Sequence, residues 1–302
     1  MIYPPTLKKG DTIGMVCPAG FMAPERFQAC VEQLQQWGYR VKLGKTMFSS
    51  SETYFSGTDE ERLQDLQQML DDKTISAILF GRGGYGVSRI IDRLDFRAFR
   101  KSPKWIIGFS DITLLHSHLN RTLKIATMHA PMAAAFNDGG YESPYVLSIR
   151  DSLAGKKMSY SCPPHDLNQE GKASGQLVGG NLALLVHAIG TASAYKLKGK
   201  ILFIEDVGEL LYNIDRMMLQ LKRSGSLDGL SALIIGGFTE NKDTERPFGR
   251  DVYEILKEYT ASYKYPVCFG FPVSHEKENY ALKVGARYLL NVGADKVTLK
   301  EK

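Results

Sequence analysis

The sequence predicts an α/β protein with an N-terminal doubly wound parallel-sheet domain and a smaller, mixed, β-rich C-terminal domain. Two observations predict this fold class. In the first half, short apolar runs typical of buried strands alternate with segments whose apolar residues recur at helical spacing. Toward the end of the chain the apolar runs become shorter and are broken by glycines, at Gly270, Gly285 and Gly293.

The domain boundary is expected where the helix and strand patterns fade. Residues 156–172 carry Pro163-Pro164 among scattered polar residues, which is typical of a crossover between domains. We therefore predict an N-terminal domain over 1–155, a linker over 156–172 and a C-terminal domain over 173–302.

Each element has its own local signal. The first domain is expected to hold strands at 11–17, 39–43, 75–80 and 105–109, with helices at 24–37, 58–70 and 111–123. Thr58 and Glu61 form a capping box at the start of one of these helices. The second domain is expected to hold strands at 175–181, 201–206 and 230–238, helices at 182–189, 209–222 and 248–262, and short strands over 266–299.

Composition excludes several classes of protein. The 302 residues are 43% hydrophobic, which is ample for packed cores, and the longest apolar runs are far too short to span a bilayer. The first residues lack the apolar segment and cleavage site of a signal peptide, so a cytoplasmic location is the default expectation. The net charge of +5 is dispersed, which gives no reason to expect nucleic acid or membrane as a partner. Four scattered cysteines indicate reduced thiols and no metal site.

Ser110 is the first candidate for chemistry. It lies between a predicted buried strand, Trp105 to Phe109, and a segment with helical spacing that begins at Asp111. At such a junction a hydroxyl projects past the sheet edge, and the Asp111 N–H can face a developing oxyanion. The pattern departs from G-x-S-x-G because Ile112 occupies the second glycine position. The alternative is that Ser110 is only a helix N-cap.

A glycine run, Gly81-Arg-Gly-Gly-Tyr-Gly86, follows the third predicted strand and matches G-x-G-x-x-G. A dinucleotide site is one interpretation, although the match follows the third strand and no ribose-binding acid ends a strand about 20 residues later. Unencumbered backbone N–H groups that serve as oxyanion donors are a second interpretation. A tight turn with positive φ is a third. This loop, Pro18 to Gly20 and Ser110-Asp111 should converge if their strands are neighbours.

A serine nucleophile needs a base and an acid that orients the base. His275 is in a loop after a strand, a placement common for catalytic groups, whereas His116, His118 and His187 are in helices and are expected to be structural. Glu205 ends a buried strand, where an unpaired carboxylate is costly and a histidine N–H is a suitable partner. Asp206 is the competitor, turned outward if the strand alternates.

Taken together, these motifs resemble the LD-carboxypeptidases, serine peptidases that include the microcin C immunity peptidases. The resemblance spans nearly the whole chain. It is carried by Leu7-Lys-Lys-Gly-Asp-Thr-Ile13, Pro18-Ala-Gly, Phe55-Ser-Gly-Thr-Asp, Arg82-Gly-Gly-Tyr-Gly-Val-Ser-Arg89, Gly108-Phe-Ser-Asp-Ile-Thr113, Leu177-Val-Gly-Gly-Asn-Leu182, Phe203-Ile-Glu-Asp206 and the His275 loop. One departure is visible, since Ser274 stands where relatives often have glycine.

The resemblance implies a triad of Ser110, Glu205 and His275, with oxyanion donors at the backbone N–H groups of Gly84 and Asp111. It implies a homodimer, no metal or cofactor, and a cytoplasmic enzyme that trims murein tetrapeptides to tripeptides. Ser110 would attack an L-to-D peptide bond, and His275 would pass the proton to the departing D-alanine.

Two residues of the glycine run are predicted to bind substrate because of their position in the sequence. Arg82 is the candidate for the D-alanine carboxylate and Gly83 lies beside it, while a surface or interdomain ion pair is the structural alternative for Arg82. Three other functions stay open: a microcin-type peptidase that cleaves an aminoacyl nucleotide analogue, a general α/β-hydrolase esterase, and a non-catalytic nucleotide-binding protein that uses Gly81 to Gly86.

Overall fold

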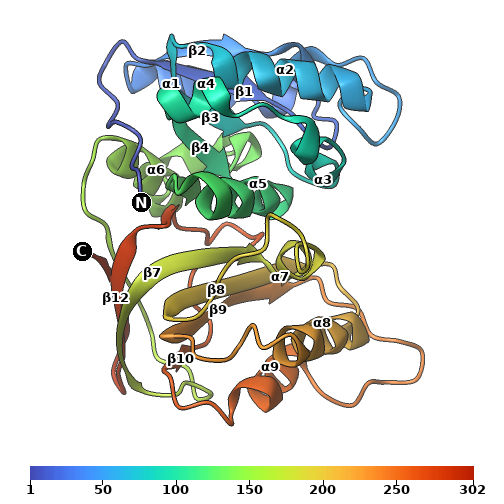
Figure 1. Cartoon of the computed structure of the whole chain (residues 1–302), viewed down its shortest axis with the longest axis vertical. Helices are drawn as coiled ribbons and strands as arrows, with labels where there is room; N and C mark the ends of the chain where they lie inside the picture. The colour runs from blue at the N-terminus through green and yellow to red at the C-terminus, as the bar shows by residue number, and fades with distance from the viewer. The chain divides into compact units, whose positions relative to one another are not determined.

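The computed structural model describes residues 1–302, which form two compact units (Figure 1). The first unit comprises residues 1–156 and 280–283, and the second comprises 157–279 and 284–302. None of the helices combines the length and the apolar character that a bilayer span requires.

The first unit is built on a six-stranded sheet in the order β11-β5-β4-β3-β1-β2. Strands β1 to β5 pair in parallel, and their 2-1-3-4-5 order is a doubly wound one, as predicted. The strands are β1 Thr12–Val16, β2 Arg40–Leu43, β3 Ile75–Phe80, β4 Trp105–Gly108, β5 Thr127–His129 and β11 Leu282–Val284. Every strand expected in this half of the chain is present.

The helices of this unit are α1 Gln28–Gln36, α2 Asp59–Asp71, α3 Val87–Ile90, α4 Arg97–Lys101, α5 Thr113–His118 and α6 Pro144–Leu153. Single 3₁₀ turns cover Pro24–Arg26, Lys45–Phe48, Ile91–Arg93, Ser110–Ile112, Ala133–Phe136 and Gly140–Glu142, and a π turn covers Leu119–Leu123. The predicted capping box starts α2: Thr58 Oγ1 accepts from the Glu61 N–H, and Glu61 accepts from the Thr58 N–H.

Helices cover both faces of this sheet. Ile13 and Met15 of β1 share one apolar cluster with residues of α1 and α6. Gly14, between them, faces the other way, where a Cβ would lie 3.0 Å from the sulfur of Met69 in α2. The side chains of a strand alternate between faces, so α2 covers the face opposite to α1 and α6.

The second unit is built on a seven-stranded sheet in the order β10-β9-β8-β7-β12-β13-β6. Strands β7 to β10 pair in parallel and the others antiparallel, which gives the predicted mixed sheet. Its elements are β6 Ser159–Cys162, β7 Gly171–Asn181, α7 Leu182–His187, β8 Lys200–Val207, α8 Leu211–Arg223, β9 Ala232–Thr239, α9 Val252–Thr260, β10 Val267–Cys268, β12 Arg287–Val292 and β13 Val297–Glu301. Ile214, Met218 and Leu221 of α8 pack in the core with β8 and β9.

Two segments differ from the expected organisation. Residues 156–172, expected to be a linker, contain β6, which pairs antiparallel with β13 and buries Tyr160 and Cys162. Four residues of alternation are too few to stand out in the sequence. Residues 280–283 return to the first unit, where β11 extends its sheet beside β5. The division of the chain therefore does not follow a single boundary.

Candidate active site

Three loops meet at the carboxyl ends of β1, β3 and β4 in the first unit. These strands are neighbours in the order β4-β3-β1, so the condition for convergence of the loops is met. The Gly20 N–H donates to the Gly83 carbonyl over 3.0 Å. A Cβ added to Gly83 would lie 3.0 Å from the Cβ of Ser110. Ligands of doubly wound sheets bind at this edge, and Ser110 lies there.

Ser110 has a strained backbone. Its φ is +61°, in the left-handed region that residues other than glycine rarely adopt. Such a conformation costs about 1–3 kcal/mol and persists only where the surroundings impose it. The N-cap positions of the following 3₁₀ turn and of α5 are Phe109 and Ile112, so Ser110 is not the helix cap that the alternative interpretation required. The geometry is that of a sharp strand-to-helix turn that presents a half-buried hydroxyl.

Backbone conformation and close neighbours favour glycine at two positions of the run beside Ser110. Gly84 has φ +96° and is exposed, and a Cβ on it would lie 2.6 Å from the hydroxyl of Tyr54. Gly86 has φ +154°, and a Cβ there would lie 2.6 Å from Arg62 Nη1. The helix that follows, α3, is a single turn, so it lacks the helix N-terminus that holds pyrophosphate in a dinucleotide fold. The run is suited to backbone recognition.

Glu205 and His275 form a pair in the second unit. His275 Nδ1 lies 2.6 Å from Glu205 Oε2, and the Glu205 side chain is fully buried on β8. Burial lowers the pKa of His275, but the charge of Glu205 and its hydrogen bond outweigh burial and raise the pKa above its usual 6.5. With Nδ1 turned to the carboxylate, Nε2 is the ring nitrogen that can serve as the base of a triad.

Ser274 helps to shape the loop that carries His275. Its buried hydroxyl donates to the Glu278 carbonyl over 3.1 Å and accepts from the Glu276 N–H at 3.0 Å. The Ser274 Cβ also lies 2.5 Å from where a Cβ on Gly237 would be. The serine that departs from the family pattern is thus part of the loop's own hydrogen bonding.

Asp206 does not turn outward as the sequence suggested. Every residue of β8 from Ile201 to Asp206 is buried, so both faces of this strand are covered and neither acidic residue reaches the surface. Asp206 accepts from Asn181 Nδ2 at 2.6 Å and from the Ala183 N–H at 2.9 Å, at the start of α7. Burial and the neighbouring Glu205 raise its pKa to about 6. Asp206 therefore supports the start of a helix, and Glu205 is the acid that meets His275.

The other histidines differ in burial. His116 is fully buried, and its Nε2 lies 2.8 Å from the Gly108 carbonyl. Burial lowers its pKa to about 4, which suits the structural role expected of it. His187 was expected inside an apolar helix, but it is exposed because only one side of α7 faces the core.

Within the first unit the Arg82 guanidinium bonds a backbone carbonyl and forms no ion pair. Its Nη1 donates to the Phe21 carbonyl over 2.6 Å, and the side chain is exposed. A guanidinium has five N–H donors, so this bond leaves several for an anion. Gly83, by contrast, is buried against Ser110.

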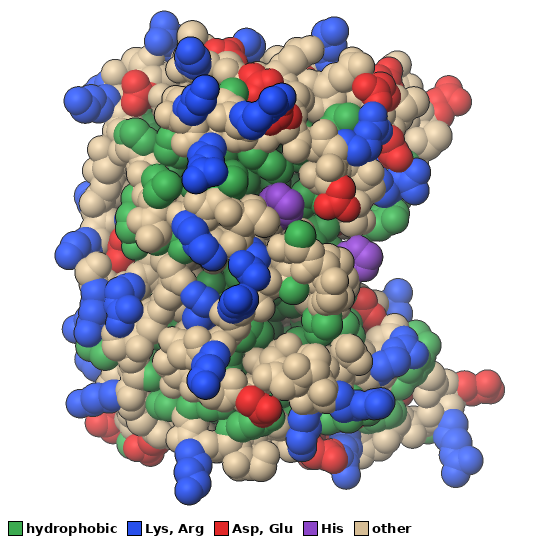
Figure 2. Space-filling view, in the orientation of Figure 1, with side chains coloured by type: hydrophobic (Ala, Val, Ile, Leu, Met, Phe, Trp, Pro, Cys, Tyr) green, Lys and Arg blue, Asp and Glu red, His purple; other side chains and the backbone are tan.

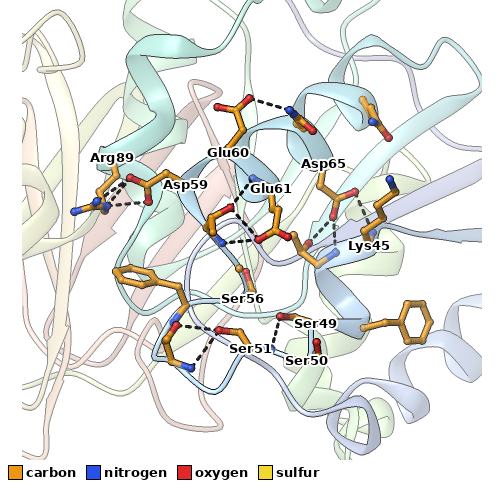
Figure 3. A pocket seen from close by; sticks show the side chains of 18 of the residues that line it. Lys45, Ser49, Ser50, Ser51, Ser56, Asp59, Glu60, Glu61, Asp65 and Arg89 are labelled. Atoms are coloured by element: carbon orange, nitrogen blue, oxygen red, sulfur yellow. Dashed lines mark hydrogen bonds and ion pairs between the residues drawn. The ribbon is translucent and has the colours of Figure 1, made fainter.

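A hollow of about 940 Å³ lies elsewhere on the first unit, between the segment 45–58 and α2 (Figure 3). Hydroxyls line it together with charged side chains. Several of those charges are already paired, Asp59 with Arg89 and Glu60 with Arg93, and Asp65 accepts from the Thr46 N–H at 2.8 Å. Neither Ser110 nor the glycine run lines this hollow, so it is not the candidate active site.

Sequence models of known families match both halves of the chain. The LD-carboxypeptidase N-terminal domain matches residues 13–130, and the LD-carboxypeptidase C-terminal domain matches residues 174–290. The chain belongs to the LD-carboxypeptidase family. It is thus a serine-type carboxypeptidase, a hydrolase, and the resemblance seen in the motifs is confirmed.

Relatives of this LD-carboxypeptidase match over almost their full lengths. The probable murein peptide carboxypeptidase of Bacillus subtilis is 35% identical over 303 residues, which cover 99% of this chain and 94% of the relative. The muramoyltetrapeptide carboxypeptidase of Oxalobacter formigenes, a solved structure, superposes with a TM-score of 0.87 at 29% identity and covers 96% and 98% of the two chains. The structure of MccF in complex with glutamyl sulfamoyl guanosine gives a TM-score of 0.86 at 26% identity, with 98% of each chain covered.

The predicted site residues thus fall into two groups. Ser110, Asp111, Arg82, Gly83 and Gly84 lie together in the first unit, and Glu205 and His275 lie together in the second. Their roles stay predictions. Three side chains at the Ser110 loops were not singled out from the sequence: Tyr54, Arg62 and the carboxylate of Asp111. Only the capping box near Arg62 drew attention to that region.

Proposed function

We propose that this LD-carboxypeptidase hydrolyses the L-D peptide bond that holds the terminal D-alanine of a murein tetrapeptide. The observation that carries the proposal is the strained Ser110, presented beside a glycine run at the carboxyl edge of the sheet. The names of the Bacillus and Oxalobacter relatives support the substrate class.

In the proposed mechanism Ser110 Oγ attacks the scissile carbonyl carbon. His275 accepts the hydroxyl proton at Nε2 and then donates it to the nitrogen of the departing D-alanine, while Glu205 stabilises the imidazolium through Nδ1. The N–H groups of Gly84 and Asp111 receive the negative charge that forms on the carbonyl oxygen. A water activated by His275 then hydrolyses the acyl-enzyme and frees the tripeptide.

Arg82 is proposed to receive the terminal carboxylate of the substrate, with Gly83 allowing the chain to pass close to Ser110. The exposed guanidinium and its remaining donors support this role, because planar donors suit a carboxylate. A side chain on Gly83 would meet Ser110 Oγ at 3.3 Å, so glycine keeps the approach open.

A microcin-type peptidase that cleaves an aminoacyl nucleotide analogue is the second candidate. It needs an aromatic ring on which a base can stack. Tyr54 and Tyr85 are exposed at the glycine run, and the Tyr54 hydroxyl is next to Gly84. This placement, with the similarity to MccF, favours testing the second substrate.

The enzyme is further proposed to act in the cytoplasm as a homodimer that binds neither nucleic acid nor membranes. Murein fragments recovered for recycling would meet it there. On the face in Figure 2, Lys and Arg side chains occur over both units, with Asp and Glu side chains among them. Light scattering should give twice the chain mass, and neither DNA nor anionic vesicles should bind; a monomer, or binding to either, contradicts this part of the proposal.

The deciding experiment is mass spectrometry of the wild type and Ser110→Ala with three substrates: a murein tetrapeptide, an all-L tetrapeptide and an aminoacyl adenylate analogue. We expect loss of D-alanine with the wild type only and no cleavage of the all-L peptide. Cleavage of the adenylate analogue alone moves the assignment to the second candidate. Equal cleavage by Ser110→Ala contradicts the nucleophile.

A further inference from the structure

One peptide group in the first unit is held at both ends by charged side chains. The Gly86 carbonyl accepts from Arg62 Nη1 at 3.1 Å, and the Val87 N–H donates to Asp111 Oδ2 over 2.8 Å. Both Arg62 and Asp111 are fully buried. The Gly86–Val87 peptide therefore has little freedom to tilt, because each of its polar atoms has a fixed partner.

This peptide is next to the proposed oxyanion donors. Gly84 lies two residues before it on the same loop, and Asp111 directly follows Ser110. Asp111 thus contributes to both donor segments: its backbone N–H belongs to the Ser110 turn, and its carboxylate binds the glycine loop. Arg62 extends the link, since the same Nη1 also donates to the Pro18 carbonyl in the loop after β1.

Stability alone does not explain why charged side chains hold this peptide, because burying a charge costs folding free energy. A neutral acceptor could satisfy the Val87 N–H without burying a charge, and a buried carboxylate is unfavourable unless its oxygens are satisfied. Here the Asp111 side chain is fully buried, and the Val87 N–H donates to its Oδ2. Burial raises the pKa of Asp111 to about 6, although the hydrogen bond from the Val87 N–H and the charge of Arg62 oppose that shift. The buried charge would be useful if it holds the Gly84 and Ser110 segments rigidly together. Oxyanion donors stabilise the transition state only when their positions are fixed.

We propose that the Asp111 carboxylate and the Arg62 guanidinium are positioning residues that fix the spacing between the Gly84 and Asp111 N–H donors. The inference rests on the proposed function, because it assumes that these two N–H groups stabilise the transition state. Neither side chain is assigned a contact with substrate.

The test compares kcat and KM for D-alanine release in Asp111→Ala, Asp111→Asn and Arg62→Met. We expect Asp111→Ala and Arg62→Met to lower kcat about 10- to 100-fold with KM changed less than about threefold, since misplaced donors weaken transition-state binding. Asp111→Asn keeps an oxygen acceptor for the Val87 N–H, so it should recover most of the lost kcat.

Two matched controls separate positioning from general loss of stability. Asp65, also buried, accepts from the Thr46 N–H away from Ser110, and buried Lys104 donates to the Met69 carbonyl at 3.0 Å. Asp65→Ala and Lys104→Met remove comparable buried charges that hold backbone groups. They should lower the melting temperature by amounts similar to those of the test variants and leave kcat within about twofold of the wild type.

The outcomes are distinct. The inference is overturned if Asp111→Ala and Arg62→Met lower kcat no more than the controls, if only KM changes, or if Asp111→Asn is as slow as Asp111→Ala. Should Asp111→Ala fail to fold, Arg62→Met perturbs the other end of the same peptide and carries the test.

A second readout keeps the inference separate from the proposed substrate. The rate at which a fluorophosphonate probe labels Ser110 depends on the same oxyanion donors but needs no peptide. If the wild type releases no D-alanine yet labels rapidly, the substrate proposal fails, and slower labelling of Asp111→Ala and Arg62→Met still supports the inference. Equal labelling of all variants overturns it.

Discussion

The first unit holds Ser110 through backbone geometry, whereas the second holds His275 through a pair of side chains. Around Ser110 the structure uses a left-handed residue, closely packed glycines and peptide N–H groups. Around His275 it uses one buried carboxylate, 2.6 Å from the imidazole. A site made from backbone is sensitive to an added methyl group. A site that depends on a charged side-chain pair is instead sensitive to the loss of one charge, as when a carboxylate is replaced by an amide.

The largest expected effect is at the nucleophile. Ser110→Ala should lower kcat for D-alanine release by about 10⁵-fold or more, as the loss of a serine nucleophile does in other serine peptidases. Ser110→Gly should be equally inactive but about 1 kcal/mol more stable than Ser110→Ala, because glycine relieves the strain at φ +61°. Denaturant unfolding measures this difference. Equal stability of the two variants would mean that the backbone conformation carries no strain.

Replacing the acid tests the side-chain half of the site. Glu205→Gln retains the shape but loses the charge that favours the imidazolium, so kcat should fall about 10³- to 10⁴-fold. Steady-state kinetics of D-alanine release measure the loss. Asp206→Asn is the matched control at the next position, because Asp206 bonds Asn181 and the start of α7. If Asp206→Asn is the slower variant, the acid has been misassigned.

The glycine run should respond to a single methyl group. Gly84→Ala should lower kcat about 10²- to 10³-fold, the loss typical of one oxyanion donor, because an alanine at φ +96° forces a shift of the backbone that carries the donor N–H. Gly139→Ala is the control, since Gly139 has φ +77° and no atom within 4 Å of an added Cβ. Both variants carry backbone strain, so comparable kcat values for the two would show that Gly84 has no role beyond its turn.

The smallest effect is a shift in pH dependence. A protonated His275 cannot take the serine proton, so kcat/KM should fall as pH decreases through the pKa of His275, with a midpoint above 6.5. In Glu205→Gln the charge that raises this pKa is gone, and burial then lowers the midpoint. NMR titration of His275 follows the shift even where turnover is slow. An unchanged midpoint would mean that Glu205 does not control the imidazole.

The sequence was sufficient where local patterns carry the information. β3 begins and ends as predicted, and the Thr58–Glu61 capping box starts α2, because strand hydrophobicity and end-capping depend on neighbouring residues. The glycine run and Ser110 were also visible, since their residue types are unusual at strand ends.

The sequence was insufficient where distant contacts decide. Asp206 is buried because both faces of β8 are covered at its end, and the sequence of one strand does not show what packs on its second face. Arg62 and the Asp111 carboxylate bind the two ends of the Gly86–Val87 peptide, each across a separation of 24 residues along the chain. The spacing of residues along the sequence does not predict contacts of this kind.

The strand β11 ties completion of the first sheet to a segment that is synthesised long after the other strands of that sheet. β11 pairs with β5 at an edge of the first sheet, and the Ala281 N–H donates to Ser148 Oγ over 2.9 Å. A nascent chain that has emerged only to residue 156 has every other strand of that sheet but leaves the edge of β5 open. At ribosomal speeds of about 5–20 residues per second, the missing strand follows about 6–25 s later. During that interval the nascent sheet has an uncovered edge, which is the kind of surface that chaperones shield.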